Sequence, residues 1–101
     1  MLNYKKLKEK YPNKIPIIVK RSKNCKLDKL EKNKFLVFNS ITLGEFLLII
    51  RKNLKLNESQ SLVLFINNTL EANSSIMSEI HNKHSPNDIL EIIYTSENTF
   101  G

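Results

Sequence analysis

The segment from Thr42 to Leu54 constrains the fold of this chain most, because two independent patterns mark it as a helix. Thr42 and Glu45 have the three-residue spacing of a capping box, which satisfies free backbone N–H groups at a helix start. Apolar side chains then recur at helical spacing, at Leu43, Phe46, Leu47, Ile50 and Leu54. A helix with such a stripe has to pack on another element, so the remaining segments must supply the surface that covers it.

Four short apolar runs are candidates for that surface. They extend over residues 14–20, 34–38, 62–66 and 89–94, and each has the length and composition of a β-strand. Pro16 has no N–H to donate to a neighbouring strand, so it belongs near a strand start or where that group would face away. The lysine-rich stretch 21–33 predicts a long loop between the first two strands. Asn67 and Asn68 tolerate positive φ and predict a turn after the third.

A short helix is predicted at the beginning of the chain, within residues 1–11. Tyr4, Leu7 and Tyr11 are spaced so that they form one stripe on such a helix. Pro12 ends it, because the residue before a proline disfavours the α conformation.

Another helix is predicted before the last strand. Ser74 or Ser75 can cap it, and its apolar residues are Ile76, Met77 and Ile80. Residues 95–101 have little to bury and are predicted to form a flexible tail. The resulting order of strands and helices favours an α+β fold, in which a sheet is covered by helices on one face.

The length of the chain fits a single domain, residues 1–101, with one core. No apolar run approaches the roughly 20 residues that a membrane helix needs, and the first residues lack the apolar segment of a secretion signal. Cys25 is the only cysteine and suits a reducing compartment. We therefore expect the protein in the cytoplasm.

The net charge of +6 is unevenly distributed. Residues 1–34 carry twelve Lys or Arg against three acids, whereas the rest carries four against seven. A basic end of this kind favours acidic peptides, anionic lipid head groups or nucleic acid, unless it is simply a solvated lysine-rich surface. For nucleic acid, the aromatic side chains of Tyr4, Tyr11 and Phe35 could stack on bases. No sequence signature of a nucleic-acid-binding module accompanies them.

Signs of catalysis or metal binding are weak. Cys25 lies in a lysine-rich loop that could lower its pKa, but His81 and His84 are far along the chain. These two histidines have helical spacing, yet further metal ligands are missing around them. With only Gly44 and Gly101, the chain also has no glycine-rich phosphate loop. We expect no enzyme activity, no cofactor and no metal site.

Six segments, in order and at matching spacing, resemble the ubiquitin-like autophagy modifiers typified by GABARAP. The resemblance extends from Leu7 to Gly101, with one residue missing just before the last strand. The segments are Lys10–Val19, Lys34–Val37, Thr42–Phe46, Ile50–Lys52, Phe65–Asn68 and Tyr94–Gly101.

The resemblance implies a ubiquitin-like β-grasp fold, with a four-stranded mixed sheet, core helices on one face and an extra N-terminal helix. This chain departs from the family pattern at three places. It is shorter at the N-terminus by about one helix, Phe38 replaces a usual proline, and Glu71–Ala72 replaces a usual proline pair.

The resemblance also implies that Gly101 is the site of lipid conjugation. An activating enzyme would adenylate its carboxylate, and a conjugating enzyme would transfer it to phosphatidylethanolamine. The lipidated protein would lie on autophagosomes or other intracellular membranes. Glycine suits this role because it has no Cβ to obstruct the reaction. A ubiquitin-like adaptor that is never conjugated is an alternative, which differs only at this residue.

The second implied site binds partner peptides of the form aromatic-x-x-aliphatic, which add as a strand to residues 34–37. Carried over by position, the aromatic pocket comprises Leu7, Pro16, Lys34, Leu36 and Ile89. The aliphatic pocket comprises Phe35, Val37, Ile41, Phe46 and Ile49. Lys32 and Lys34 would attract acidic residues before the motif. Cargo receptors and adaptors with such motifs are the implied partners, and nucleic acid is not among them.

Overall fold

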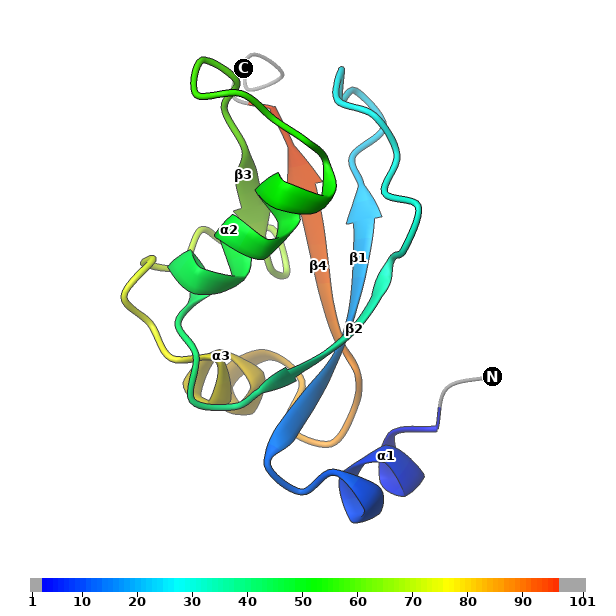
Figure 1. The fold of residues 1–101 in the computed structure, drawn as a ribbon. Helices are drawn as coiled ribbons and strands as arrows, with labels where there is room; N and C mark the ends of the chain where they lie inside the picture. Colours follow the sequence, from blue (N-terminus) through cyan, green and yellow to red (C-terminus); the bar gives the residue numbers. More distant parts are fainter. Residues whose placement is uncertain (1–2, 97–101) are drawn as a thin grey trace.

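The computed structural model describes residues 3–96, and within them the helices and strands follow the predicted order (Figure 1). The elements are α1 (Tyr4–Lys10), β1 (Lys14–Arg21), β2 (Lys34–Phe38), α2 (Leu43–Asn53), β3 (Val63–Phe65), α3 (Met77–His84) and β4 (Leu90–Thr95).

Helix α2 begins with the predicted capping box. The Thr42 side chain accepts a hydrogen bond from the Glu45 backbone N–H at 3.1 Å, and the Glu45 carboxylate accepts one from the Thr42 N–H at 3.0 Å. Arg51 and Lys52 lie in the last turn, where positive charge interacts favourably with the helix dipole. The capping box between Thr42 and Glu45 thus determines the start of this helix, as the sequence predicts.

Helix α3 begins differently, and the prediction of a serine cap is wrong. Its N-cap is Ile76, and no side chain caps it. Instead, the N–H groups of Met77 and Ser78 donate to the backbone carbonyls of Ile41 and Asn39, at 2.8 and 3.0 Å. The loop before α2 thus satisfies the free donors of α3, which makes a local cap unnecessary.

The four strands form one mixed sheet in the order β2-β1-β4-β3. The central pair, β1 and β4, is parallel, and β2 and β3 are antiparallel edge strands. This is the predicted four-stranded mixed sheet of an α+β fold, with the additional N-terminal helix α1.

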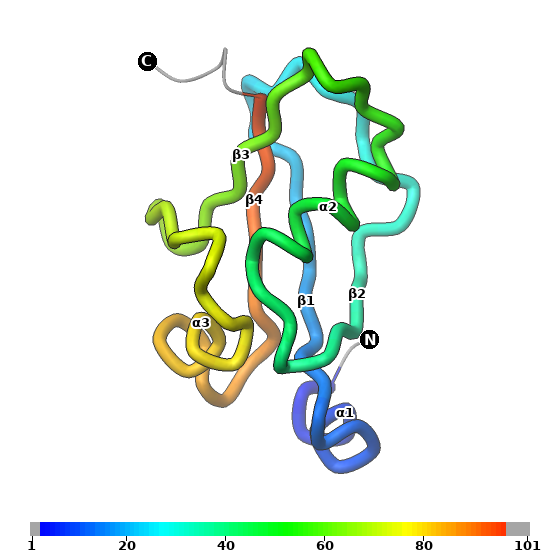
Figure 2. Tube along the Cα trace, turned by 60° about the vertical axis from the view of Figure 1, so that its left-hand side comes forward, coloured from blue at the N-terminus to red at the C-terminus, as the bar shows by residue number. Residues whose placement is uncertain are grey.

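The core lies between the sheet and helices α2 and α3. Alternate residues of β1, namely Ile15, Ile17 and Val19, are at most 2% exposed, and they face Phe46 and Ile50 of α2. The residues between them on β1 point to the opposite face. Figures 1 and 2 show α1 at one end of the molecule and the end of β4 at the other.

Several boundaries differ from the prediction. β3 is shorter, because Ile66 leaves the sheet and pairs with Thr69 to close the turn at Asn67 and Asn68, whose φ angles are 51° and 61°. β4 includes Thr95, which pairs with Val63 and is 4% exposed.

The N-terminal helix lies within the predicted range, but the start of the C-terminal tail needs a correction. Thr95 and Ser96 are both buried, so the predicted flexible tail of residues 95–101 does not begin there. At the other end, Asn3 is the N-cap of α1, and its side chain accepts from the Lys6 N–H at 3.2 Å. Residues 1–2 and 97–101, with the predicted conjugation site Gly101, lie outside the described residues.

Residues 3–96 contain neither a membrane-spanning helix nor a cluster of metal ligands. No helix there has the length and hydrophobicity to cross a membrane. In the same residues, no three potential metal-ligating side chains come together.

Candidate functional site

Strand β2 lies at an edge of the sheet, so half of its backbone groups have no neighbouring strand within residues 3–96. Hydrogen bonds at the two ends of its pairing with β1 show which half. Val19 N–H donates to the Asn33 carbonyl at 2.8 Å, and Asn39 N–H donates to the Asn13 carbonyl at 2.9 Å. In an antiparallel ladder the bonded pairs alternate, so the bonded residues of β2 are the odd-numbered ones.

The backbone groups of Phe35 and Val37 therefore point toward β1, opposite Ile17 and Ile15. Those of Lys34 and Leu36 point away from the sheet and are available to an added strand. Pro16 lies opposite Leu36, at a pair that needs no hydrogen bond. This register explains why a proline, which has no N–H, is tolerated inside β1.

A cavity of about 150 Å³ opens beside this edge, on the face of the sheet away from α2. Its lining consists of Leu7, Pro16, Lys32, Lys34, Phe35 and Leu36. The structure thus brings together four of the five residues predicted for the aromatic pocket. Ile89 is not among the lining residues; it is partly buried just before β4.

Helix α1 contributes Leu7 to the cavity, and Tyr4 fixes the position of this helix. The Tyr4 ring lies 5.5 Å from the His81 ring of α3, and the Tyr4 hydroxyl donates to the Pro86 carbonyl at 3.5 Å. His81 is 5% exposed, and its Nε2–H donates to the Asp88 carbonyl at 2.8 Å. His81 therefore has a structural role beneath α1.

The residues predicted for the aliphatic pocket lie on the other face of the edge, between β2 and α2. Phe46 is completely buried and packs edge to face against Phe35, with 5.6 Å between ring centroids. Because it has no accessible surface, Phe46 can only support the residues that line such a pocket and cannot contact a peptide itself. Val37 and Ile41 are partly buried, whereas Ile49 is 39% exposed.

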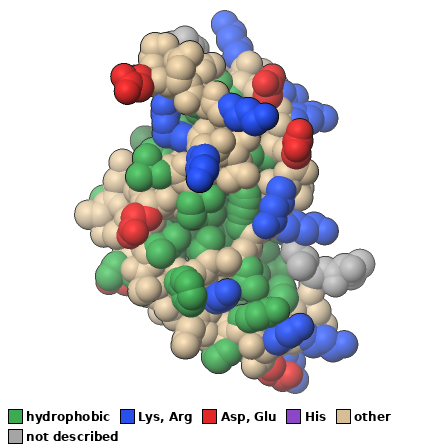
Figure 3. All heavy atoms as spheres, viewed as in Figure 1, with side chains coloured by type: hydrophobic (Ala, Val, Ile, Leu, Met, Phe, Trp, Pro, Cys, Tyr) green, Lys and Arg blue, Asp and Glu red, His purple; other side chains and the backbone are tan. Residues whose placement is uncertain are grey.

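Two apolar residues outside the predicted pockets, Leu48 and Phe38, are more exposed than Ile49. Leu48 and Phe38 have 63% and 58% of their surface accessible. Figure 3 shows hydrophobic side chains gathered on the face that carries α2 and β2. In the sequence, Leu48 lies off the core stripe of α2, which already marks it as a candidate for such a surface. Phe38 is the residue that replaces a usual proline of the family pattern, and the structure adds that it is exposed at the end of β2.

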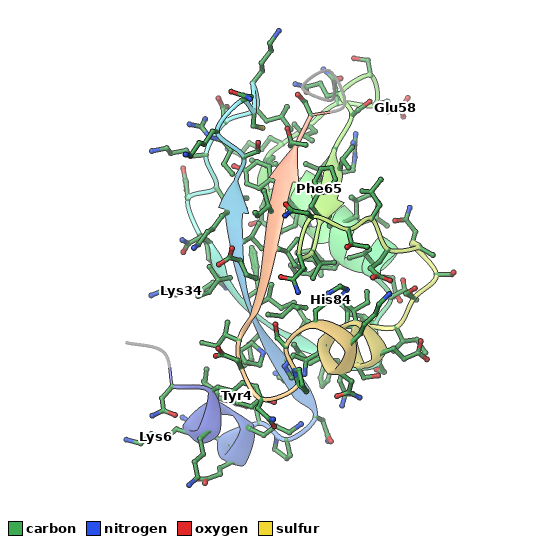
Figure 4. All side chains as sticks on the ribbon, turned by 180° about the vertical axis from the view of Figure 1, so that it is seen from behind. Tyr4, Lys6, Lys34, Glu58, Phe65 and His84 are labelled. Carbon is green, nitrogen blue, oxygen red and sulfur yellow. The ribbon has the colours of Figure 1, made fainter. Side chains whose placement is uncertain are left out.

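Positive charge surrounds the first cavity. Lys34 points away from the sheet edge (Figure 4), and the Lys32 ammonium lies 5.6 Å from the centre of the Phe35 ring. Among residues 3–96, the ion pairs involve other lysines, namely Lys20 and Lys83. The rim of the cavity thus presents two cations to an approaching ligand.

A cluster on the opposite side of the fold gives a structural role to Glu71, which stands where the family pattern has a proline. The Glu71 carboxylate accepts from His84 Nε2–H at 2.8 Å and from the Lys83 ammonium at 3.0 Å. The Asn67 amide donates to the other nitrogen of His84 at 3.2 Å. These hydrogen bonds, first that of His84 and then that of Lys83, lower the pKa of Glu71. They attach the loop after β3 to α3, as a structural clasp.

Comparisons with known proteins agree with this architecture. The family described as autophagy protein Atg8, ubiquitin-like, matches residues 1–101. Autophagy-related protein 8c of Arabidopsis thaliana is 36% identical over 97 residues, which are 95% of this chain and 82% of that protein. Autophagy-related protein 8 of Mycosarcoma maydis is 34% identical over 97 residues, with the same coverage.

A solved structure gives the same result. The crystal structure of Trypanosoma brucei ATG8 superposes with a TM-score of 0.87 and 31% sequence identity, covering 97% of this chain and 85% of that one. The predicted ubiquitin-like fold and the predicted resemblance are thereby confirmed.

Proposed function

Because this chain belongs to the Atg8 family of ubiquitin-like autophagy proteins, we propose that it is a protein modifier with two working parts. Its C-terminal Gly101 is conjugated to phosphatidylethanolamine, and the free edge of β2 recruits partner proteins to the membrane. It is a substrate of the activating and conjugating enzymes and catalyses nothing itself. It acts in the cytoplasm and, once lipidated, on autophagosomes or related intracellular membranes.

The free edge of β2 is the observation that supports this proposal most. The outward backbone groups of Lys34 and Leu36 can pair with an extended peptide, which adds a fifth strand to the sheet. The cavity beside them has an apolar floor formed by Leu7, Pro16 and Leu36, which suits an aromatic side chain. Main-chain hydrogen bonds then supply affinity, and the cavity supplies selectivity.

The second anchor of the peptide, an aliphatic side chain, contacts the other face of the edge. Val37, Ile41 and Ile49 offer accessible apolar surface there, above the buried Phe46. Lys32 and Lys34 attract acidic residues that precede the motif, which accelerates association and makes it sensitive to salt. Exposed Phe38 adjoins this region in sequence and is expected to modify its preference.

Conjugation needs a carboxylate that reaches the active sites of other enzymes. β4 ends at Thr95, and Gly101 is the fifth residue after Ser96. An extended chain of five residues spans at most roughly 16–18 Å. In the active site of the activating enzyme, the carboxylate of Gly101 is adenylated with ATP and then passed to an enzyme cysteine as a thioester. The amine of phosphatidylethanolamine then displaces that cysteine and forms an amide.

Intact-mass measurement of the protein from the membrane fraction of its own cells tests the proposal, with fragmentation across the tail. We expect an added mass of one phosphatidylethanolamine on Gly101. In a reconstituted reaction, Gly101→Ala should conjugate far more slowly while its peptide affinity is unchanged. An unmodified chain on membranes under autophagy-inducing conditions would instead favour an adaptor that is never conjugated.

A further inference from the structure

The loop of residues 22–33 concentrates positive charge at one end of the molecule. β1 and β4 are parallel, with Arg21 opposite Tyr94, so both strands end at this place. Figures 1 and 2 show the loop beside the end of β4, with α1 at the other end. The basic loop and the start of the C-terminal segment thus share one end of the fold.

The loop is held in place by hydrogen bonds from both strands. The Tyr94 hydroxyl donates to the Asp28 carbonyl at 2.6 Å, and Arg21 Nη1–H donates to the Leu27 carbonyl at 3.0 Å. The Ser22 N–H donates to the Tyr94 carbonyl at 2.9 Å. The basic side chains are therefore carried by a folded loop that is fixed to the sheet.

Two lysines of the loop, together with the arginine that ends β1, surround a shallow cavity of about 260 Å³. Arg21, Lys23 and Lys29 line it together with the buried Tyr94. Of the basic residues near this end, Lys20 is neutralised by Glu91 at 3.0 Å. No carboxylate of residues 3–96 forms an ion pair with the three that line the cavity. The acids of the loop itself, Asp28 and Glu31, are exposed and leave it with net positive charge.

We infer that this end of the domain, centred on Arg21, Lys23 and Lys29, docks on the anionic head groups of a lipid bilayer. The inference deepens the proposed function and rests on it, because conjugation of Gly101 would place the bilayer here. Five residues cover at most roughly 16–18 Å, so the anchored lipid lies close to this loop. Attraction of this kind falls off within a Debye length, about 10 Å at 0.1 M salt.

Docking at this end also determines which surfaces face the cytoplasm. The molecule extends 39 Å along its long axis, and α1 lies at the far end from the loop. The cavity that Leu7 of α1 helps to line therefore points away from the bilayer. A domain held in this orientation keeps its peptide-binding edge accessible, whereas the lysines of α1 do not reach the same membrane.

Binding of the unconjugated full chain to vesicles tests the inference without requiring conjugation. We compare phosphatidylcholine vesicles with vesicles that contain about a third phosphatidylserine, at low and high salt. The test variant is Lys23→Gln/Lys29→Gln. The matched control is Lys5→Gln/Lys6→Gln, which removes the same charge from exposed positions of α1. Arg21 is left unchanged because it holds the loop.

We expect the chain to bind the phosphatidylserine vesicles and to be released by salt. A lysine near an anionic bilayer contributes roughly fivefold to partitioning, so the test variant should bind at least about tenfold more weakly. The control should change by less than about twofold.

Three results would overturn the inference: equal losses in both variants, no selective binding to anionic vesicles, or binding to a single-stranded RNA oligonucleotide alone. Conjugation is measured separately, on vesicles that contain phosphatidylethanolamine. A chain that is conjugated there but ignores phosphatidylserine contradicts this docking surface and leaves the proposed function intact. A chain that binds phosphatidylserine vesicles but is not conjugated supports this docking surface and contradicts the proposed conjugation.

Discussion

Replacement of Leu36 by alanine should weaken both the stability of the fold and the binding of a peptide, because the side chain contributes to each. Leu36 is partly buried in the free protein, and its remaining surface lines the cavity beside the β2 edge. The substitution removes three carbon atoms, and each fully buried one contributes about 0.8 kcal/mol, roughly 2.4 kcal/mol together. If about a third of this surface is left for a peptide to cover, binding loses about 0.8 kcal/mol. This corresponds to an approximately fourfold increase in Kd.

The fold should lose the rest, about 1.6 kcal/mol, which a domain with a stability of roughly 5–15 kcal/mol tolerates. Titration calorimetry with an aromatic-x-x-aliphatic peptide measures the first loss, and urea unfolding measures the second. Leu70→Ala is the matched control, because Leu70 is 57% exposed in the loop after β3, at the other edge of the sheet. It should leave Kd unchanged and alter stability by less than about 0.5 kcal/mol.

An unchanged Kd for Leu36→Ala, together with the expected loss of stability, would refute the site as described. It would show that the side chain serves the fold only and that peptides bind elsewhere. An equal increase in Kd for Leu70→Ala would point to a general loosening of the domain.

Two further substitutions test the core and the clasp. Phe46→Ala removes a completely buried ring and should cost about 3–5 kcal/mol in urea unfolding; a loss below about 1 kcal/mol would contradict the packing against Phe35. Glu71→Gln should remove a pH-dependent part of the stability. The folded pKa of Glu71 lies below its ordinary value of 4.5, so its contribution is present above pH 4.5 and disappears as the pH falls through the folded pKa. The difference in unfolding free energy between the unchanged protein and Glu71→Gln should therefore disappear as the pH falls below the folded pKa. A difference that stays constant over this pH range would exclude the hydrogen bonds of Glu71 with Lys83 and His84.

Elements determined by neighbouring residues could be predicted from the sequence. The capping box at Thr42 and the turn at Asn67 and Asn68 depend on side chains within a few positions, and both occur as predicted. The grouping of Leu7, Pro16 and Leu36 is implied by the family resemblance. Their spacing in the chain alone does not bring them together.

Features that depend on distant contacts could not be predicted. The first N–H groups of α3 donate to the carbonyls of Ile41 and Asn39, which are 36 and 39 residues away, so no local cap marks the start of this helix. Burial of Thr95 follows from its pairing with Val63 at the far edge of the sheet. The family resemblance places Ile89 in the aromatic pocket by position, and only the three-dimensional structure shows that it lies outside the cavity lining.

The spacing of the proposed peptide motif follows from the two faces of the β2 edge. Side chains alternate between the faces of a strand, so residues i and i+3 of an added strand point to opposite sides. The cavity with Leu36 lies on the α1 side of the edge, and the surface with Val37 and Ile49 lies on the α2 side. Two intervening residues therefore direct the aromatic and aliphatic anchors into separate pockets. A single intervening residue would direct both to the same face and leave one pocket empty.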